Sequence, residues 1–142
     1  MSIEEKRTWI MGAVALVAYC LYLATVLPRA AATSLATMDY VGPLLWSIGG
    51  AIIAAIVLNL AILIGAPRSA MATDQRDKEI NRSGEYIGQS FVVLGAISAL
   101  ILAMLEAPHA YIANVIYLGF VLSALLESVS KIVAYRRGFV GW

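Results

Sequence analysis

Four long apolar runs constrain this chain more than any other feature. They extend over about 9–27, 45–64, 87–105 and 112–130. Each run is close to the roughly 20 residues that a helix needs to cross the hydrocarbon core of a membrane. Because lipid offers the backbone no hydrogen-bonding partner, segments of this length must be helical. The sequence therefore predicts an all-α fold, a four-helix transmembrane bundle that forms a single membrane domain over residues 1–142.

The composition agrees with lipid as the solvent of this chain. Of its 142 residues, 61% are hydrophobic and 13% are charged, far from the balance of an ordinary soluble domain. The formal net charge is +1, so the lipid bilayer is the expected partner and no nucleic acid is expected. The only cysteine, Cys20, lies inside the first run, and we expect it to be a small buried hydrophobic residue.

The basic residues predict how the chain is oriented in the membrane. All lysines and arginines except Arg29 lie before the first run, between the second and third runs, or after the fourth. Lysine and arginine accumulate on the cytoplasmic side of membrane proteins. We therefore expect both termini and the polar segment 65–86 in the cytoplasm, and a multi-pass protein of the bacterial plasma membrane.

The longest polar segment, residues 69–86, separates the second run from the third. Asp74 with Lys78, and Glu79 with Arg82, have the spacing of ion pairs on a helix. Such a helix would continue into the third run. Two interpretations of this segment stay open at this point. It is either a solvated connector between two spans or a docking surface for a cytoplasmic protein partner.

One carboxylate inside the membrane is the main candidate for chemistry, because ionisable groups are costly in lipid. Glu127 lies four residues before Lys131, close enough for the two to pair on a helix. Polar residues expected at a similar depth extend this pair to a candidate intramembrane polar cluster: Glu127, Asn59, Gln89, Lys131, Ser123 and Ser130. The cluster either fixes helix packing, at about 0.6–2 kcal/mol per contact, or forms a cavity in which Glu127 binds a proton or a cation.

Small residues and tyrosines indicate which helix faces pack. Tyr19 and Tyr22 share a face and need hydroxyl partners, so they are expected to point at another helix. Stripes of small residues, which let helices approach closely, occur on two spans: Gly84, Gly88, Gly95, Ala99 and Ala103 on the third, and Ser47, Gly50, Ala54, Ala61 and Gly65 on the second. Packing within the bundle accounts for one stripe, and the other is left for self-association.

The motifs of enzymes and metal sites are missing from the sequence. Glu106 and His109 lie three residues apart in a short loop, but His109 is the only histidine, and a metal site needs three or four ligands. The chain has no glycine-rich phosphate loop, nucleophile elbow or HExxH sequence. We therefore expect no enzymatic activity, no catalytic residue, no metal and no cofactor.

Several segments resemble a family of small four-helix integral membrane proteins that is common in actinobacteria. The resemblance covers most of the chain and rests on these residues: Asp74–Ile80, which reads DQRDKEI, Gly84, Gly88, Ile112–Asn114 and Tyr135–Phe139. It implies the same four-helix topology. It implies no activity, because that family has no established active site.

These observations favour a non-enzymatic interaction or regulatory protein, whose polar segment 69–86 and arginine-rich tail contact a cytoplasmic partner. One alternative is a small proton- or cation-coupled transporter that uses Glu127. Small multidrug exporters also have four spans, but they place their glutamate in the first helix, where this chain has no acidic residue within the run. The other alternative is an accessory subunit of a larger membrane complex.

Overall fold

A computed structural model describes residues 3–34, 37, 39–65 and 75–137 of the chain. These residues form four helices: α1 (Ile3–Ala32), α2 (Val41–Gly65), α3 (Gln75–Met104) and α4 (His109–Arg137). All four are long and apolar enough to cross a membrane. The all-α prediction is confirmed, and the four helices are those of a multi-pass membrane protein.

Each helix extends beyond its apolar run, and α3 does so most. It begins at Gln75, so residues 75–86 of the expected polar connector form the first three turns of α3. The predicted continuation of a polar helix into the third span is therefore confirmed. Asp74, which is expected to form an ion pair with Lys78, lies outside the described residues. Glu79 and Arg82 form no ion pair within 4.0 Å in the described part of the chain.

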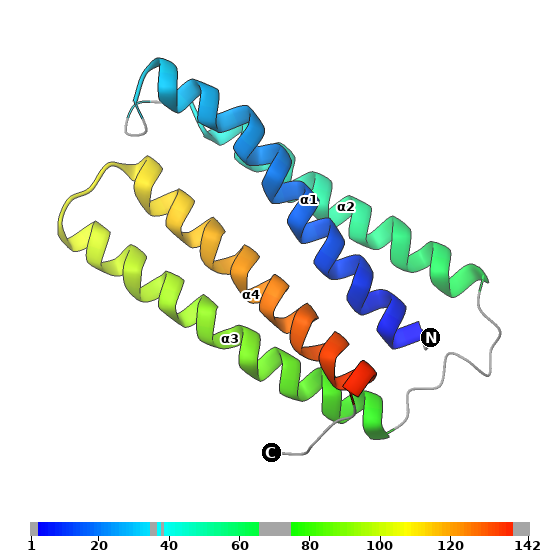
Figure 1. Ribbon diagram of the computed structural model, residues 1–142. Helices are drawn as coiled ribbons and strands as arrows, with labels where there is room; N and C mark the ends of the chain where they lie inside the picture. The colour runs from blue at the N-terminus through cyan, green and yellow to red at the C-terminus, as the bar shows by residue number, and fades with distance from the viewer. Residues whose placement is uncertain (1–2, 35–36, 38, 66–74, 138–142) are drawn as a thin grey trace.

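The helices pack in an open row rather than around a common axis. The most extensive contact joins α3 to α4, and smaller contacts join α4 to α1 and α1 to α2. Figure 1 shows α3 and α4 as one antiparallel pair beside the pair of α1 and α2. We call the end formed by residues 3–8, 59–65, 75–85 and 127–137 the charged end, and the end formed by residues 25–34, 39–47 and 102–114 the loop end.

Glycines bring α3 and α4 into close contact. A Cβ atom added at Gly95 would lie 3.1 Å from the Cα of Gly119 on α4. A Cβ atom added at Gly88 would lie 2.9 Å from the backbone oxygen of Ser123. Both distances are tighter than ordinary Cβ contacts, so a side chain at either position would push the two helices apart. The small-residue stripe of the third span is therefore used within the fold.

A tight turn connects these two helices. Glu106 has a positive φ of 56°, and the amide of Ala107 donates to the carbonyl of Leu102 at 2.9 Å. The amide of Glu106 itself donates to the carbonyl of Ala103 at 3.1 Å. These bonds form a Schellman motif, in which glycine is the usual residue at the left-handed position. Pro108 then ends the connection before α4 begins.

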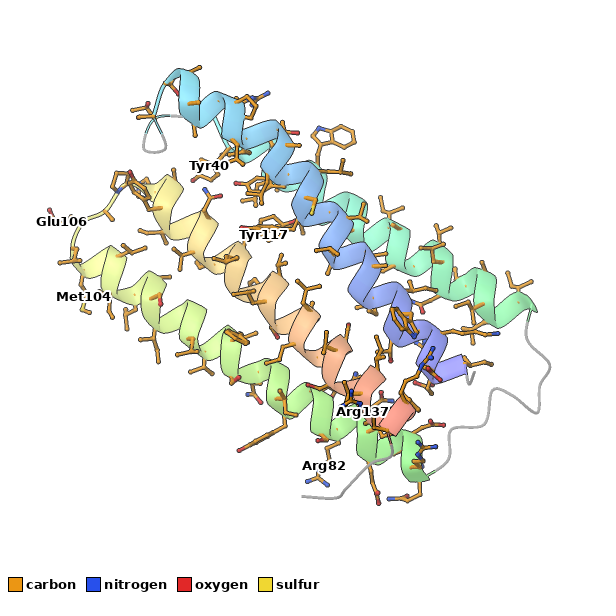
Figure 2. All side chains as sticks on the ribbon, in the orientation of Figure 1. Tyr40, Arg82, Met104, Glu106, Tyr117 and Arg137 are labelled. Atoms are coloured by element: carbon orange, nitrogen blue, oxygen red, sulfur yellow. The ribbon has the colours of Figure 1, made fainter. Side chains whose placement is uncertain are left out.

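The buried core lies toward the loop end, where α1 meets α4. It consists of Tyr22, Val26, Tyr117 and Val121, with the ring of Tyr19 packed edge-on against Tyr117 at a centroid distance of 5.4 Å. Figure 2 shows Tyr117 projecting from α4 toward α1. The prediction that these tyrosines point at another helix is confirmed.

Hydroxyl groups tie three helices together at this core. The hydroxyl of Tyr22 donates to Oδ1 of Asn114 on α4. The hydroxyl groups of Tyr117 and Ser47 are hydrogen-bonded to each other, and Ser47 also donates to the carbonyl of Ala18 at 2.9 Å. Because polar groups inside lipid need partners, these bonds fix the orientation of α1, α2 and α4.

The outer surfaces of α1 and α2 are open. Residues 41–65 of α2 are all described, and none of them is buried within the chain. No atom lies within 4 Å of a Cβ placed at Gly50, so this part of the second small-residue stripe is unoccupied in the described structure. The expectation that Cys20 is buried is wrong, because this residue is exposed on the outer face of α1.

Candidate functional site

A polar cavity of 370 Å³ opens at the charged end, and all four helices contribute to it. Its lining residues are Glu4, Arg7, Thr8 and Met11 of α1, Asn59 of α2, Asn81 and Glu85 of α3, and Ala124, Glu127, Ser128 and Lys131 of α4. The lining thus combines three carboxylates with two cations and two amides. Groups with opposite charges lie close to one another in this lining.

An ion pair forms the α4 wall of the cavity. Nζ of Lys131 lies 2.6 Å from Oε1 of Glu127, four residues earlier in the helix. A glutamate that precedes a lysine by four residues is the favourable order on a helix, and the position near the end of α4 also suits a cation. The pair predicted from the sequence is confirmed.

Lys131 is buried because α3 passes directly over it. Its relative exposure is 9%, and a Cβ atom at Gly84 would lie 2.6 Å from its Cγ. The alkyl chain of the lysine therefore fills the space that the glycine leaves, while its ammonium reaches the carboxylate of Glu127. Gly84 is the residue of α3 that makes room for this ion pair.

The first turns of α1 connect to each of the other helices. Nδ2 of Asn81 on α3 donates to Oε2 of Glu4 at 3.2 Å. Nε of Arg7 donates to Oδ1 of Asn59 on α2 at 3.3 Å. Arg7 also lies 3.6 Å from Glu4 as an ion pair. The start of α1 is thus the hub that joins α2 and α3 across the cavity.

Outside the cavity, a further set of contacts secures the end of α4. The hydroxyl of Tyr135 donates to Oδ1 of Asp77 at 2.8 Å, and Nε of Arg136 donates to Oε1 of Glu5 at 3.2 Å. The guanidinium of Arg76 lies 5.8 Å from the centroid of the Tyr135 ring, within the range of a cation–π contact. The contacts of Tyr135 hold the polar first turns of α3 against α4, and the contact of Arg136 holds α1 against α4.

The structure brings together three of the six residues of the predicted polar cluster. Asn59, Glu127 and Lys131 line the cavity. Ser123 is buried against Gly88 in the α3–α4 contact and has a packing role. Gln89 is exposed and Ser130 is half-buried, and neither lines the cavity.

Sequence reasoning missed the cavity residues of α1 and α3. Glu4, Arg7, Asn81 and Glu85 lie outside the apolar runs, where polar residues carry no signal of a site. Because the helices continue past those runs, these residues lie on the same helix faces as residues inside the membrane. Extending each helix by two or three turns and comparing the faces would have placed Asn81 on the same side of α3 as Gly84 and Gly88.

Four of the five ionisable groups of the cavity form ion pairs with one another. Two of the three carboxylates are already paired with Lys131 and Arg7, and the third, Glu85, is exposed. Among the described residues, no group of three or more His, Cys, Asp and Glu is placed to hold a metal ion. Glu106 occupies the α3–α4 turn and His109 begins α4, as parts of the connection between the helices.

Comparisons with known proteins add no further assignment of this site. No protein-family model, no curated protein and no solved structure matches the chain.

Proposed function

We propose that this chain is a multi-pass protein of the bacterial plasma membrane, with both termini in the cytoplasm, that acts as a non-enzymatic interaction or regulatory protein. The orientation is supported by the basic residues, since all of them except Arg29 belong to the charged end or to segments adjoining it. In this proposal the charged end faces the cytoplasm and contacts a protein partner.

The observation that carries the proposal is the division of the first turns of α3 into two faces. Asp77, Ile80 and Gly84 are buried against the rest of the chain. Lys78, Glu79 and Arg82 are exposed, and we call these three residues the outward face of α3. Figure 2 shows Arg82 pointing away from the other helices.

This face carries exposed charges of both signs. In the described part of the chain, neither Lys78 nor Arg82 has a carboxylate within 4.0 Å. Among the described residues, Glu79 accepts a long hydrogen bond of 3.4 Å from Gln75. Exposed charges of both signs on a rigid helix give orientation and specificity to an encounter with a complementary surface. The rest of the expected docking segment, residues 69–74, lies outside the described residues.

The test is recovery of a partner from the native host in mild detergent, followed by quantitative mass spectrometry. The double variant Lys78→Glu/Arg82→Glu reverses two charges of the outward face without touching a buried residue. We expect a protein that is recovered with the wild type to be lost with this variant. The control Glu106→Lys changes an exposed charge at the opposite end and should retain that protein. Recovery of nothing beyond the chain, or equal recovery with the double variant, refutes the proposal.

A second candidate function is a small proton- or cation-coupled transporter. The observation in its favour is the 370 Å³ cavity, in which the carboxylate of Glu127 is part of the lining. Proton flux into liposomes that contain the protein and a trapped pH-sensitive dye tests this function. Glu127→Gln should abolish flux while the variant still folds, whereas Glu79→Gln on the outward face should leave it unchanged. Equal flux with and without the protein rules the transporter out.

An accessory subunit of a larger complex is the third candidate, and the open face of α2 favours it. None of residues 41–65 is buried in the described chain, although the helix is among the most apolar of the four. A neighbouring membrane helix, from another protein or from a second copy, would cover this face. Co-migration with other proteins on a native gel distinguishes this assignment from self-association, which gives a multiple of the chain mass.

A further inference from the structure

A second, larger space lies between α1 and α2 and is unrelated to the cavity at the charged end. It is a groove of 930 Å³ that extends from Ala13 to Arg29 along α1 and from Gly42 to Leu58 along α2. By helical rise each stretch is roughly 24 Å long, more than one leaflet of a hydrocarbon core of about 30 Å. The groove is therefore long enough for an acyl chain of a membrane lipid.

The groove exists because small residues line the facing sides of both helices. Ala18, Gly50, Ala51 and Ala54 are among its lining residues, and nothing in the described structure lies within 4 Å of a Cβ at Gly50. Larger apolar side chains, among them Leu21 and Trp46, form the rims, and both are highly exposed. An empty apolar groove would forfeit dispersion contacts, so in a membrane it is filled.

Two opposite charges lie at the loop end of this groove. Arg29 and Asp39 both belong to its lining, and Nη1 of Arg29 donates to the backbone oxygen of Asp39 at 3.0 Å. This bond uses the carbonyl group, so the carboxylate of Asp39 is left for another partner. Within the part of the chain that the structure describes, neither charged group has an opposite charge within 4.0 Å.

We propose that this groove binds a phospholipid whose headgroup carries both a phosphodiester and a primary ammonium, as in phosphatidylethanolamine. The guanidinium of Arg29 donates to the phosphate oxygens, for which its planar array of N–H groups is suited. The ammonium of the headgroup donates to the carboxylate of Asp39. An acyl chain follows the small residues between α1 and α2 toward Leu58.

The pair of charges selects this headgroup over other common ones. A headgroup that is anionic without an amine satisfies Arg29 but brings its negative charge toward Asp39. A trimethylammonium headgroup carries the positive charge but has no N–H to donate. Specificity of this kind arises when a wrong ligand leaves one group of the site unpaired.

The experiment measures lipid binding to the full-length protein by native mass spectrometry in detergent. The probes are phosphatidylethanolamine, phosphatidylglycerol and phosphatidylcholine with identical acyl chains. We expect the wild type to bind phosphatidylethanolamine about tenfold more tightly than either of the others, the scale of one charge-assisted hydrogen bond. Asp39→Asn should remove this preference, and Arg29→Gln should weaken binding of all three lipids.

Arg82→Gln is the matched control, because it removes an arginine charge from the opposite end and should leave lipid binding unchanged. Arg29→Lys keeps the cation and should retain most of the binding, which separates loss of charge from loss of fold. Equal binding of the three lipids by the wild type overturns the proposal. A Cys20→Ser/Gly50→Cys variant that cross-links to a second copy of itself and retains no lipid also overturns the proposal, because a second chain then fills the groove.

Discussion

The two antiparallel helix pairs of this protein differ in how closely their helices pack. In the α3–α4 pair, glycines let backbone meet backbone, because a Cβ atom at Gly88 or Gly95 would lie closer to α4 than ordinary contacts allow. In the α1–α2 pair, Gly50 faces a groove of 930 Å³. The same residue type therefore closes one contact and opens the other.

In the closed pair, a small residue of α4 lies directly opposite each of these glycines. Gly95 faces Gly119, and Gly88 faces a serine whose oxygens lie against it. Small residues on both helices let the axes approach, which is how helices associate without a hydrophobic driving force in lipid. At Gly50 the nearby lining residues are small as well, but hydrogen bonds at Ser47 and Asn59 fix α2 at its two ends. Between these two hydrogen bonds, no residue of α1 lies within 4 Å of a Cβ placed at Gly50 in the described structure.

The largest effect is expected from a side chain placed in the closed contact. Gly88→Val puts a Cβ 2.9 Å from the backbone oxygen of Ser123, so the helices must separate, and stability should fall by about 3 kcal/mol. Gly50→Val is the matched control in the open pair and should change stability by less than about 1 kcal/mol. Reversible unfolding in mixed micelles measures both. Similar losses for the two variants would show that the contrast between the pairs is wrong.

A smaller loss should follow from removing one partner of the ion pair beneath Gly84. Glu127→Gln leaves the buried ammonium of Lys131 without its carboxylate at 2.6 Å, at a cost of about 2 kcal/mol. Lys131→Met removes the other partner. The double variant should be more stable than the sum of the two losses predicts, as measured by the same unfolding assay. Strict additivity would mean that the two groups do not stabilise each other.

The core between the pairs should respond more weakly. Tyr22→Phe removes the hydroxyl that donates to Asn114 and should lower stability by about 1 kcal/mol, the scale of one interhelical hydrogen bond in a membrane. Adding Asn114→Ala to Tyr22→Phe should cause no further loss of stability from this hydrogen bond, because its donor is already absent. Thermal unfolding in detergent checks this coupling, and independent effects would argue that Tyr22 acts through packing alone.

The smallest change is a gain at the turn of the closed pair. Glu106 holds a φ of 56°, a conformation that costs a residue with a Cβ about 1–2 kcal/mol. Glycine relieves this cost but loses about 0.5–1 kcal/mol through the entropy of the unfolded chain. Glu106→Gly should therefore stabilise the protein by roughly 0.5–1 kcal/mol. Glu106→Ala, which keeps the Cβ, should give no gain in the same unfolding measurement.

Some features of the fold could be predicted from the sequence because they depend on residues close together in the chain. The four spans follow from apolar length, and helicity follows from the absence of water as a hydrogen-bonding partner. The pairing of Glu127 with Lys131 follows from their spacing on one helix. The contact of Tyr22 with another helix follows because a hydroxyl group inside lipid needs a hydrogen-bonding partner.

Which helices meet, and what lies between them, depends on how the whole chain packs. Periodicity gives each helix its faces but not its neighbours, so Gln89 and Ser130 were placed in a cluster whose cavity they do not line. The residues that complete that cavity, among them Glu4 and Asn81, come from ends of helices far apart in the sequence. The open groove likewise depends on the distance between α1 and α2, which packing of the whole chain sets and no single segment encodes.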